Sequence, residues 1–185
     1  PMSKVPLSAP STASFTDMFV LDAGAWHQIW RFVTAMFLHG DLLHLVYNMF
    51  ALLLFGSIVE GLIGSRRFLI TYFVTGIIAN LIAVNFYSSS LGASGAIYGV
   101  IGALIVLRPT LMVWAFGIPM PMVVAGLLWV AGDAIGIFMP SNVANIAHLS
   151  GIGLGIVFGF MFRKYALEPC WSSIRSTSTS GSAGP

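Results

Sequence analysis

A serine and a histidine that could act as nucleophile and general base lie within apolar stretches of this sequence. Ser94 precedes Arg108 by 14 residues, and His148 precedes Arg163 by 15 residues. At a helical rise of 1.5 Å per residue, each side chain lies about 21–23 Å from an arginine that marks one end of its apolar stretch. The counting predicts that Ser94 and His148 lie at one depth, as a hydroxyl–imidazole pair requires.

Two further polar residues are predicted to join this pair. His44 and Asn48 are four residues apart, so they share one face of a helix.

The helix that begins at Ser94 ends near Leu107 and is about 21 Å long, which is too short to cross a hydrocarbon core of about 30 Å. Its first N–H groups therefore lie within the membrane, where they favour an oxyanion.

The composition requires a bilayer as the solvent for most of the chain. Of 185 residues, 57% are hydrophobic and only 8% are charged, whereas an average soluble domain carries about 25% charge. Soluble globular, disordered, coiled-coil and collagen-like classes are excluded. A net charge of +2 without a basic cluster excludes nucleic acid as a partner. Cys170 is the single cysteine, which excludes an internal disulfide and a cysteine metal cluster.

The pattern of apolar stretches predicts an all-α, polytopic membrane helical bundle. Residues 17–40 carry the aromatic anchors Trp26, Trp30 and Phe37 and are predicted to form an interfacial, half-inserted external loop. Residues 111–118 are apolar but too short to cross alone, so we expect them to lie in the interface or to extend the fifth span. The predicted spans are residues 42–63, 68–87, 91–107, 119–139 and 143–162.

Basic residues follow alternate spans, and this pattern predicts how the protein is oriented in the membrane. The positive-inside rule places them and the C-terminus in the cytoplasm, and residues 17–40 outside. We expect an integral multi-pass protein of the plasma membrane. Residues 1–16 form a polar N-terminal segment, and the Ser/Thr/Gly-rich residues 166–185 are predicted to be a disordered cytoplasmic tail. The basic residues are Arg66, Arg67, Arg108, Arg163 and Lys164.

Five motifs in order resemble the rhomboid intramembrane serine proteases over residues 17–165. Each motif alone is common, whereas the whole set in this order and spacing is specific. The motifs are Trp30-Arg31, His44-x-x-x-Asn48, Gly56-x-x-x-Glu60-x-x-x-Gly64, Gly92-Ala93-Ser94-Gly95 with Tyr98, and Ala147-His148-x-x-Gly151-x-x-x-Gly155.

The resemblance implies a serine endopeptidase that cleaves transmembrane segments near the outer face of the membrane. It implies Ser94 as nucleophile and His148 as general base, with no required carboxylate, cofactor or metal. His44, Asn48 and the Ser94 backbone amide would form the oxyanion hole, and Tyr98 would pack beside His148. The implied partners are transmembrane-segment substrates and the lipid bilayer.

The resemblance also assigns supporting parts of the fold. Gly92 lies beside Ser94, and Trp30 and Arg31 would belong to the membrane-inserted external loop. The segment before Pro119 and the span that follows it would form a side gate for the substrate. The family core has six spans, of which five are visible in this sequence.

Other roles for these residues are weighed against this interpretation. Ser94 could be a small packing residue. Asp133 is expected to hydrogen-bond locally on its own helix rather than to orient a histidine. A metal site made of His39, His44 and His148 lacks the ligand spacing of a motif such as H-E-x-x-H.

Two other functions remain open at this point. A non-catalytic rhomboid-like scaffold would be expected to have lost the serine or the histidine, and both are present. A transporter or proton relay could use His44, Glu60, Asp133 and His148. It would be expected to show an internal repeat with interrupted helices, which the sequence lacks.

Overall fold

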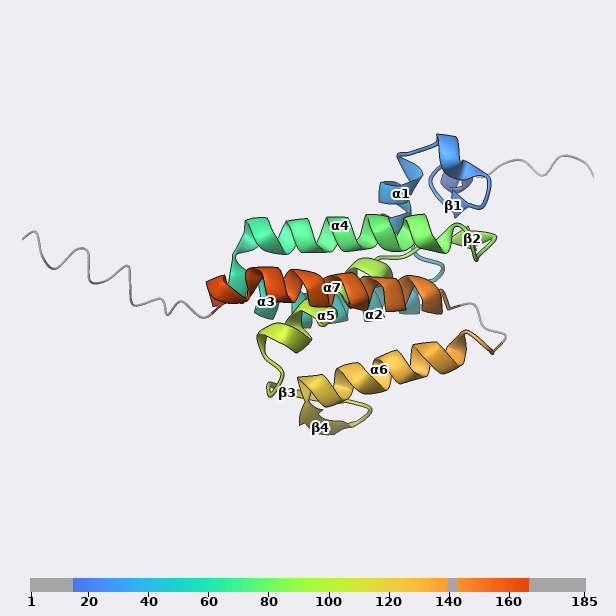
Figure 1. The fold of residues 1–185 in the computed structure, drawn as a ribbon. Coiled ribbons are helices and arrows are strands. Elements are labelled where there is room, and N and C mark those ends of the chain that lie inside the picture. Colours follow the sequence, from blue (N-terminus) through green and yellow to red (C-terminus); the bar gives the residue numbers. More distant parts are fainter. Residues whose placement is uncertain (1–14, 140–142, 167–185) are drawn as a thin grey trace, which may run out of the picture.

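The computed structural model describes residues 15–139 and 143–166. In this structure apolar helices pack side by side in a bundle (Figure 1). Three described helical segments are long and apolar enough to cross a membrane: residues 42–63, 65–83 and 145–166. The helices are α2 (Leu42–Ala51), which continues through the π-helical turn η4 (Leu52–Gly56) into α3 (Ser57–Ile63), α4 (Ser65–Ala83), α5 (Ser94–Leu107), α6 (Met122–Gly136) and α7 (Asn145–Ala166).

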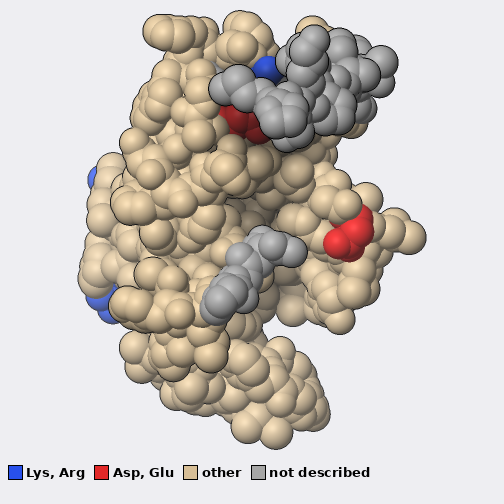
Figure 2. Space-filling model, turned by 90° about the vertical axis from the view of Figure 1, so that its right-hand side faces the viewer, with Lys and Arg blue, Asp and Glu red and all other residues tan. Residues whose placement is uncertain are grey.

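The surface of the bundle is apolar, as the composition predicts. Large apolar side chains such as Leu53, Leu127 and Phe160 are 63–73% exposed, which fits a protein surrounded by lipid. Figure 2 looks onto the end of the bundle where α7 begins and shows a surface almost free of charged side chains. The predicted segments 1–16 and 166–185 lie almost wholly outside the described residues.

Four of the five predicted spans differ in their bounds from the helices that form, and two of them show the physical reason. The span predicted at 68–87 is α4, which begins at Ser65 because Gly64 (φ +82°) ends α3 and turns the chain at once. The span predicted at 119–139 begins only at Met122, because the preceding residues form strands. In both cases local backbone structure, a glycine turn or a strand, rather than hydropathy decides where the helix begins.

The residues before α6 form an antiparallel hairpin of β3 (Met112–Ala115) and β4 (Ile118–Pro121). Phe116 (φ +54°) and Gly117 (φ +79°) make its two-residue turn. Positive φ at both positions matches the twist of a two-residue hairpin. The prediction that residues 111–118 extend the fifth span is therefore wrong, since most of them form this hairpin. A second pair of short strands, β1 (Leu21–Asp22) and β2 (Ser89–Ser90), lies at the other end of the bundle.

The segment before α2 is irregular and is attached to α4. It contains the short helix α1 (Arg31–Thr34) between the 3-10 turns η1 (Phe15–Met18), η2 (Ala25–His27) and η3 (Ala35–Phe37). The Asn80 side chain of α4 donates a 2.8 Å hydrogen bond to the Phe32 carbonyl. This bond connects the segment to the bundle.

Glycine lets α5 and α7 approach backbone to backbone. A Cβ atom at Gly151 would overlap the carbonyl oxygen of Gly95, and one at Gly155 would overlap that of Gly99. A Cβ at Gly102 would overlap the Ile152 carbonyl in the same way. Small residues at four-residue spacing allow this close packing of membrane helices.

The glycine crossing generates a prediction about stability. Gly155→Ala is expected to lower the free energy of unfolding in detergent by about 1–3 kcal/mol, because the added methyl group meets rigid backbone. Gly153→Ala is the matched control, since a Cβ at Gly153 meets nothing within 4 Å. Thermal unfolding of the two purified variants checks this. Equal melting temperatures would show that the crossing tolerates a side chain.

Candidate active site

Ser94 and His148 lie within hydrogen-bond distance of each other. The distance from Ser94 Oγ to His148 Nε2 is 2.9 Å. Ser94 is the first residue of α5, and His148 lies in the first turn of α7. The two helices that cross at the glycines therefore present these side chains at the same end of the bundle. A nucleophile and a base at this separation can exchange a proton.

The other ring nitrogen of His148 faces a carboxylate. Asp133 Oδ1, on α6, lies 3.0 Å from His148 Nδ1. The two residues are buried, with 6% and 8% of their surfaces exposed. The prediction that Asp133 hydrogen-bonds locally on its own helix is therefore wrong. Its helix turns the carboxylate toward α7, and sequence spacing within α6 holds no information about that rotation.

The aromatic ring of Tyr98 covers one face of the His148 imidazole. The two ring centroids are 4.1 Å apart and the planes differ by 10°. Tyr98 lies one helical turn after Ser94 on α5. The stacked ring restrains the plane of the imidazole, while the contacts at its two nitrogens restrain its rotation in that plane.

His44 and Asn48 lie on α2, beside the start of α5. The Asp41 side chain caps this helix by accepting a 2.7 Å hydrogen bond from the His44 N–H. Asn48 is buried, and its Nδ2 donates a 2.9 Å hydrogen bond to the His44 carbonyl. Gly92 has φ +123°, and a Cβ there would lie 2.9 Å from His44 Cε1. Glycine is thus required both by the backbone and by the imidazole beside it.

A second histidine packs against His44. The rings of His39 and His44 meet edge to face with centroids 5.1 Å apart. Burial and the neighbouring His44 ring lower the pKa of His39, so that its neutral form is favoured at neutral pH. Within residues 15–139 and 143–166, no three His, Cys, Asp or Glu side chains gather as metal ligands.

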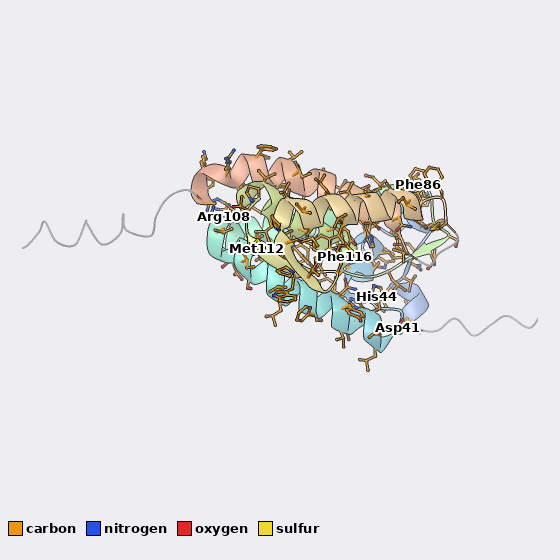
Figure 3. The ribbon with its side chains drawn as sticks, turned by 90° about the horizontal axis from the view of Figure 1, so that it is seen from below. Asp41, His44, Phe86, Arg108, Met112 and Phe116 are labelled. Carbon is orange, nitrogen blue, oxygen red and sulfur yellow. The ribbon has the colours of Figure 1, made fainter. Side chains whose placement is uncertain are left out.

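A cavity of about 1180 Å³ brings these side chains together. Aromatic side chains form part of its wall, and Figure 3 shows Phe116 of the hairpin between the ends marked by His44 and Arg108. The polar residues on its lining include His44, Asn48, Ser94, Tyr98 and His148, together with Asp41, Tyr47, Tyr87, Ser88, Ser89 and Ser90. Polar groups that converge in a largely apolar cavity are typical of a binding or catalytic site.

Trp30 and Arg31 lie away from this cavity. Arg31 Nη1 donates a hydrogen bond of 2.8 Å to the Val20 carbonyl and one of 2.9 Å to the Asp22 carboxylate. Trp30 is half exposed, and its Nε1 donates a 3.4 Å hydrogen bond to the Met18 carbonyl. Both side chains connect parts of the segment before α2 to one another.

The family model of the Rhomboid domain matches residues 26–165. The chain belongs to the rhomboid family. This confirms the resemblance drawn from the five motifs. The helical architecture and the apolar surface of this rhomboid-family chain are those of an integral membrane protein with an all-α bundle.

Curated relatives lie at about 30% identity. The chain is 29% identical to RHOMBOID-like protein 6, mitochondrial, of Arabidopsis thaliana over 98% of its own length and 60% of that protein. It is 30% identical to RHOMBOID-like protein 1 of Arabidopsis thaliana over 88% of its length and 42% of that protein. It is 29% identical to Rhomboid protease GlpG of Haemophilus influenzae over 76% of its length and 75% of that protein. The chain thus spans about half the length of the Arabidopsis proteins.

The site makes a prediction about Gly92. Gly92→Ala is expected to slow the reaction of Ser94 with a fluorophosphonate by about 10²-fold, because an added methyl group displaces the His44 ring. Gly61→Ala is the matched control, since a Cβ at Gly61 meets nothing within 4 Å and Gly61 lies outside the cavity lining. Labelling rates of the purified variants in detergent check this. Equal rates would mean that the position of His44 does not affect Ser94.

Proposed function

We propose that this rhomboid-family protein is an intramembrane serine endopeptidase, with Ser94 as nucleophile and His148 as general base. The observation that carries the proposal is the 2.9 Å separation of Ser94 Oγ and His148 Nε2 beside a cavity enclosed by apolar helices. The family membership and the relative named a rhomboid protease support the same activity.

The reaction starts with proton transfer. Nε2 of His148 takes the hydroxyl proton of Ser94 while Oγ forms a bond to the carbonyl carbon of the scissile peptide. The carbonyl π electrons move to the oxygen. The intermediate then expels the amine, which takes the proton from Nε2, and leaves an acyl-enzyme. Water, deprotonated by the same imidazole, hydrolyses this ester and releases the second product.

The negative oxygen of the intermediate requires hydrogen-bond donors. Asn48 Nδ2 carries two hydrogens, one of which bonds the His44 carbonyl and the other of which can reach an oxyanion. The His44 ring and the free N–H groups at the start of α5 supply further donors. Donors fixed by a helix need no rearrangement as charge develops, which is the main source of their effect on rate.

The substrate enters from the bilayer between α2 and α6 in this mechanism. Phe55 of η4 and Trp129 of α6 meet edge to face across this opening, with ring centroids 5.8 Å apart. Both side chains line the cavity. A transmembrane helix must unwind before its peptide bonds are accessible, because each amide is hydrogen-bonded within the helix. Substrates with Gly or Pro near the cleavage site are therefore favoured.

The positions of the arginine residues support the predicted orientation of the protein in the membrane. Figure 3 shows His44 near one end of the bundle and Arg108 at the opposite end. With the arginine end in the cytoplasm, the cavity lies toward the outer face and receives water from that side. We assign the protein to the plasma membrane with a cytoplasmic C-terminus.

Removal of either reacting group tests the activity. Ser94→Ala and His148→Ala are expected to abolish cleavage of a single-span substrate in proteoliposomes, followed by gel analysis of the products. Ser57→Ala and His27→Ala are the matched controls, because both side chains are exposed and lie outside the cavity lining. Cleavage by either of the first two variants would contradict the assignment.

Asn48 provides a graded test of the oxyanion hole. Asn48→Ala is expected to lower kcat by about 10²–10³-fold with little change in KM, because the donor acts on the transition state. Asn85→Ala removes an exposed amide that bonds only to α4 carbonyls, and it is expected to retain full activity. Steady-state kinetics on a transmembrane peptide separate the two parameters. A rise in KM alone would assign Asn48 to substrate binding.

A further inference from the structure

We propose that Asp133 is the positioning residue for His148, holding its imidazole in the tautomer that can accept the proton of Ser94. The proposal rests on the proposed function of the Ser94–His148 pair and adds a third member to it. It also gives a role to a buried carboxylate that the resemblance to the family does not require.

Each ring nitrogen of His148 has one partner. Nε2 lies 2.9 Å from Ser94 Oγ, and Nδ1 lies 3.0 Å from Asp133 Oδ1. The three groups come from three different helices, α5, α6 and α7. From these neighbours, α6 presents Asp133 to the ring and α5 presents Ser94 and Tyr98.

The chemistry of the carboxylate decides the position of the ring hydrogen. An ionised carboxylate accepts hydrogen bonds and donates none, so Nδ1 must carry the hydrogen in the contact with Asp133. Nε2 of the neutral ring is then left with its lone pair directed at the serine hydroxyl. During the reaction the proton of Ser94 moves to Nε2, while the hydrogen on Nδ1 stays in place. The carboxylate stabilises the positive imidazolium that forms.

A purely structural role does not account for Asp133. The other buried residues of α6 are Met122, Ala125 and Gly126, which are apolar or small. Oδ2 of Asp133 is buried and has no hydrogen-bond partner within the described residues. Burial of a carboxylate costs free energy unless a specific partner compensates it, so an ionisable residue at this position needs such a partner. The contact with His148 Nδ1 is the hydrogen bond that Asp133 Oδ1 makes, and the Tyr98 side chain also interacts with this carboxylate.

Asp133→Asn tests the proposal without changing the size of the side chain. The fluorophosphonate labelling rate of Ser94 and kcat are expected to fall by about 10²-fold or more, with KM unchanged. Asp22→Asn, at a carboxylate that pairs with Arg31 away from the cavity, is the matched control. An unchanged kcat and labelling rate in Asp133→Asn, or a change in KM alone, would overturn the proposal.

A measurement on the wild-type protein covers the case in which the variant fails to fold. The ¹⁵N NMR signals of His148, assigned by comparison with His148→Gln, report which nitrogen carries the hydrogen in the neutral ring. We expect the hydrogen on Nδ1, and a hydrogen on Nε2 would refute the role of Asp133. Wild-type protein that neither labels at Ser94 nor cleaves a substrate would instead refute the proposed function, while the tautomer would still decide the role of Asp133.

Discussion

The close crossing of α5 and α7 is the contact on which the candidate site depends. Gly95 lies against Gly151 and Gly99 against Gly155 at the same offset in sequence, so the two helices run parallel and in fixed register. Ser94 and His148 begin these helices at the same end. A larger residue in the crossing would separate the backbones, and a 2.9 Å hydrogen bond tolerates very little separation.

The apolar exterior of the bundle explains why its polar side chains gather in one place. Lipid offers no hydrogen bonds, so a buried polar group must find its partner within the protein. Ser94, His148 and Asp133 form one such chain of partners, while Asn48 turns to the His44 carbonyl. On α4, the hydroxyl groups of Thr71 and Thr75 donate hydrogen bonds to carbonyls of that same helix. The proposed chemistry thus lies where polar side chains from three different helices meet.

The sequence predicts what depends on hydropathy and on helical rise. The first span, the start of the third apolar helix at Ser94, and the common depth of Ser94 and His148 all follow from such counting. The Asp133 contact does not follow, because it depends on how α6 is rotated about its own axis. The hairpin of β3 and β4 does not follow from the sequence either, for a different reason. Residues 112–121 read as an apolar stretch, and the turn needs a positive φ at Phe116, a residue type that seldom adopts it.

α6 is held at its first turn and carries the carboxylate of Asp133 near its other end. Its first turn is fixed by backbone hydrogen bonds from Met122 to Leu111 and from Val123 to Pro109, and Met122 is fully buried. Asp133 lies eleven residues further on, about 16 Å along the axis, so a tilt of about 10° about the fixed end displaces its carboxylate by about 3 Å. That displacement equals the whole length of the hydrogen bond to His148. In the proposed mechanism, the carboxylate of Asp133 therefore stays hydrogen-bonded to His148 only while α6 keeps its tilt relative to α7.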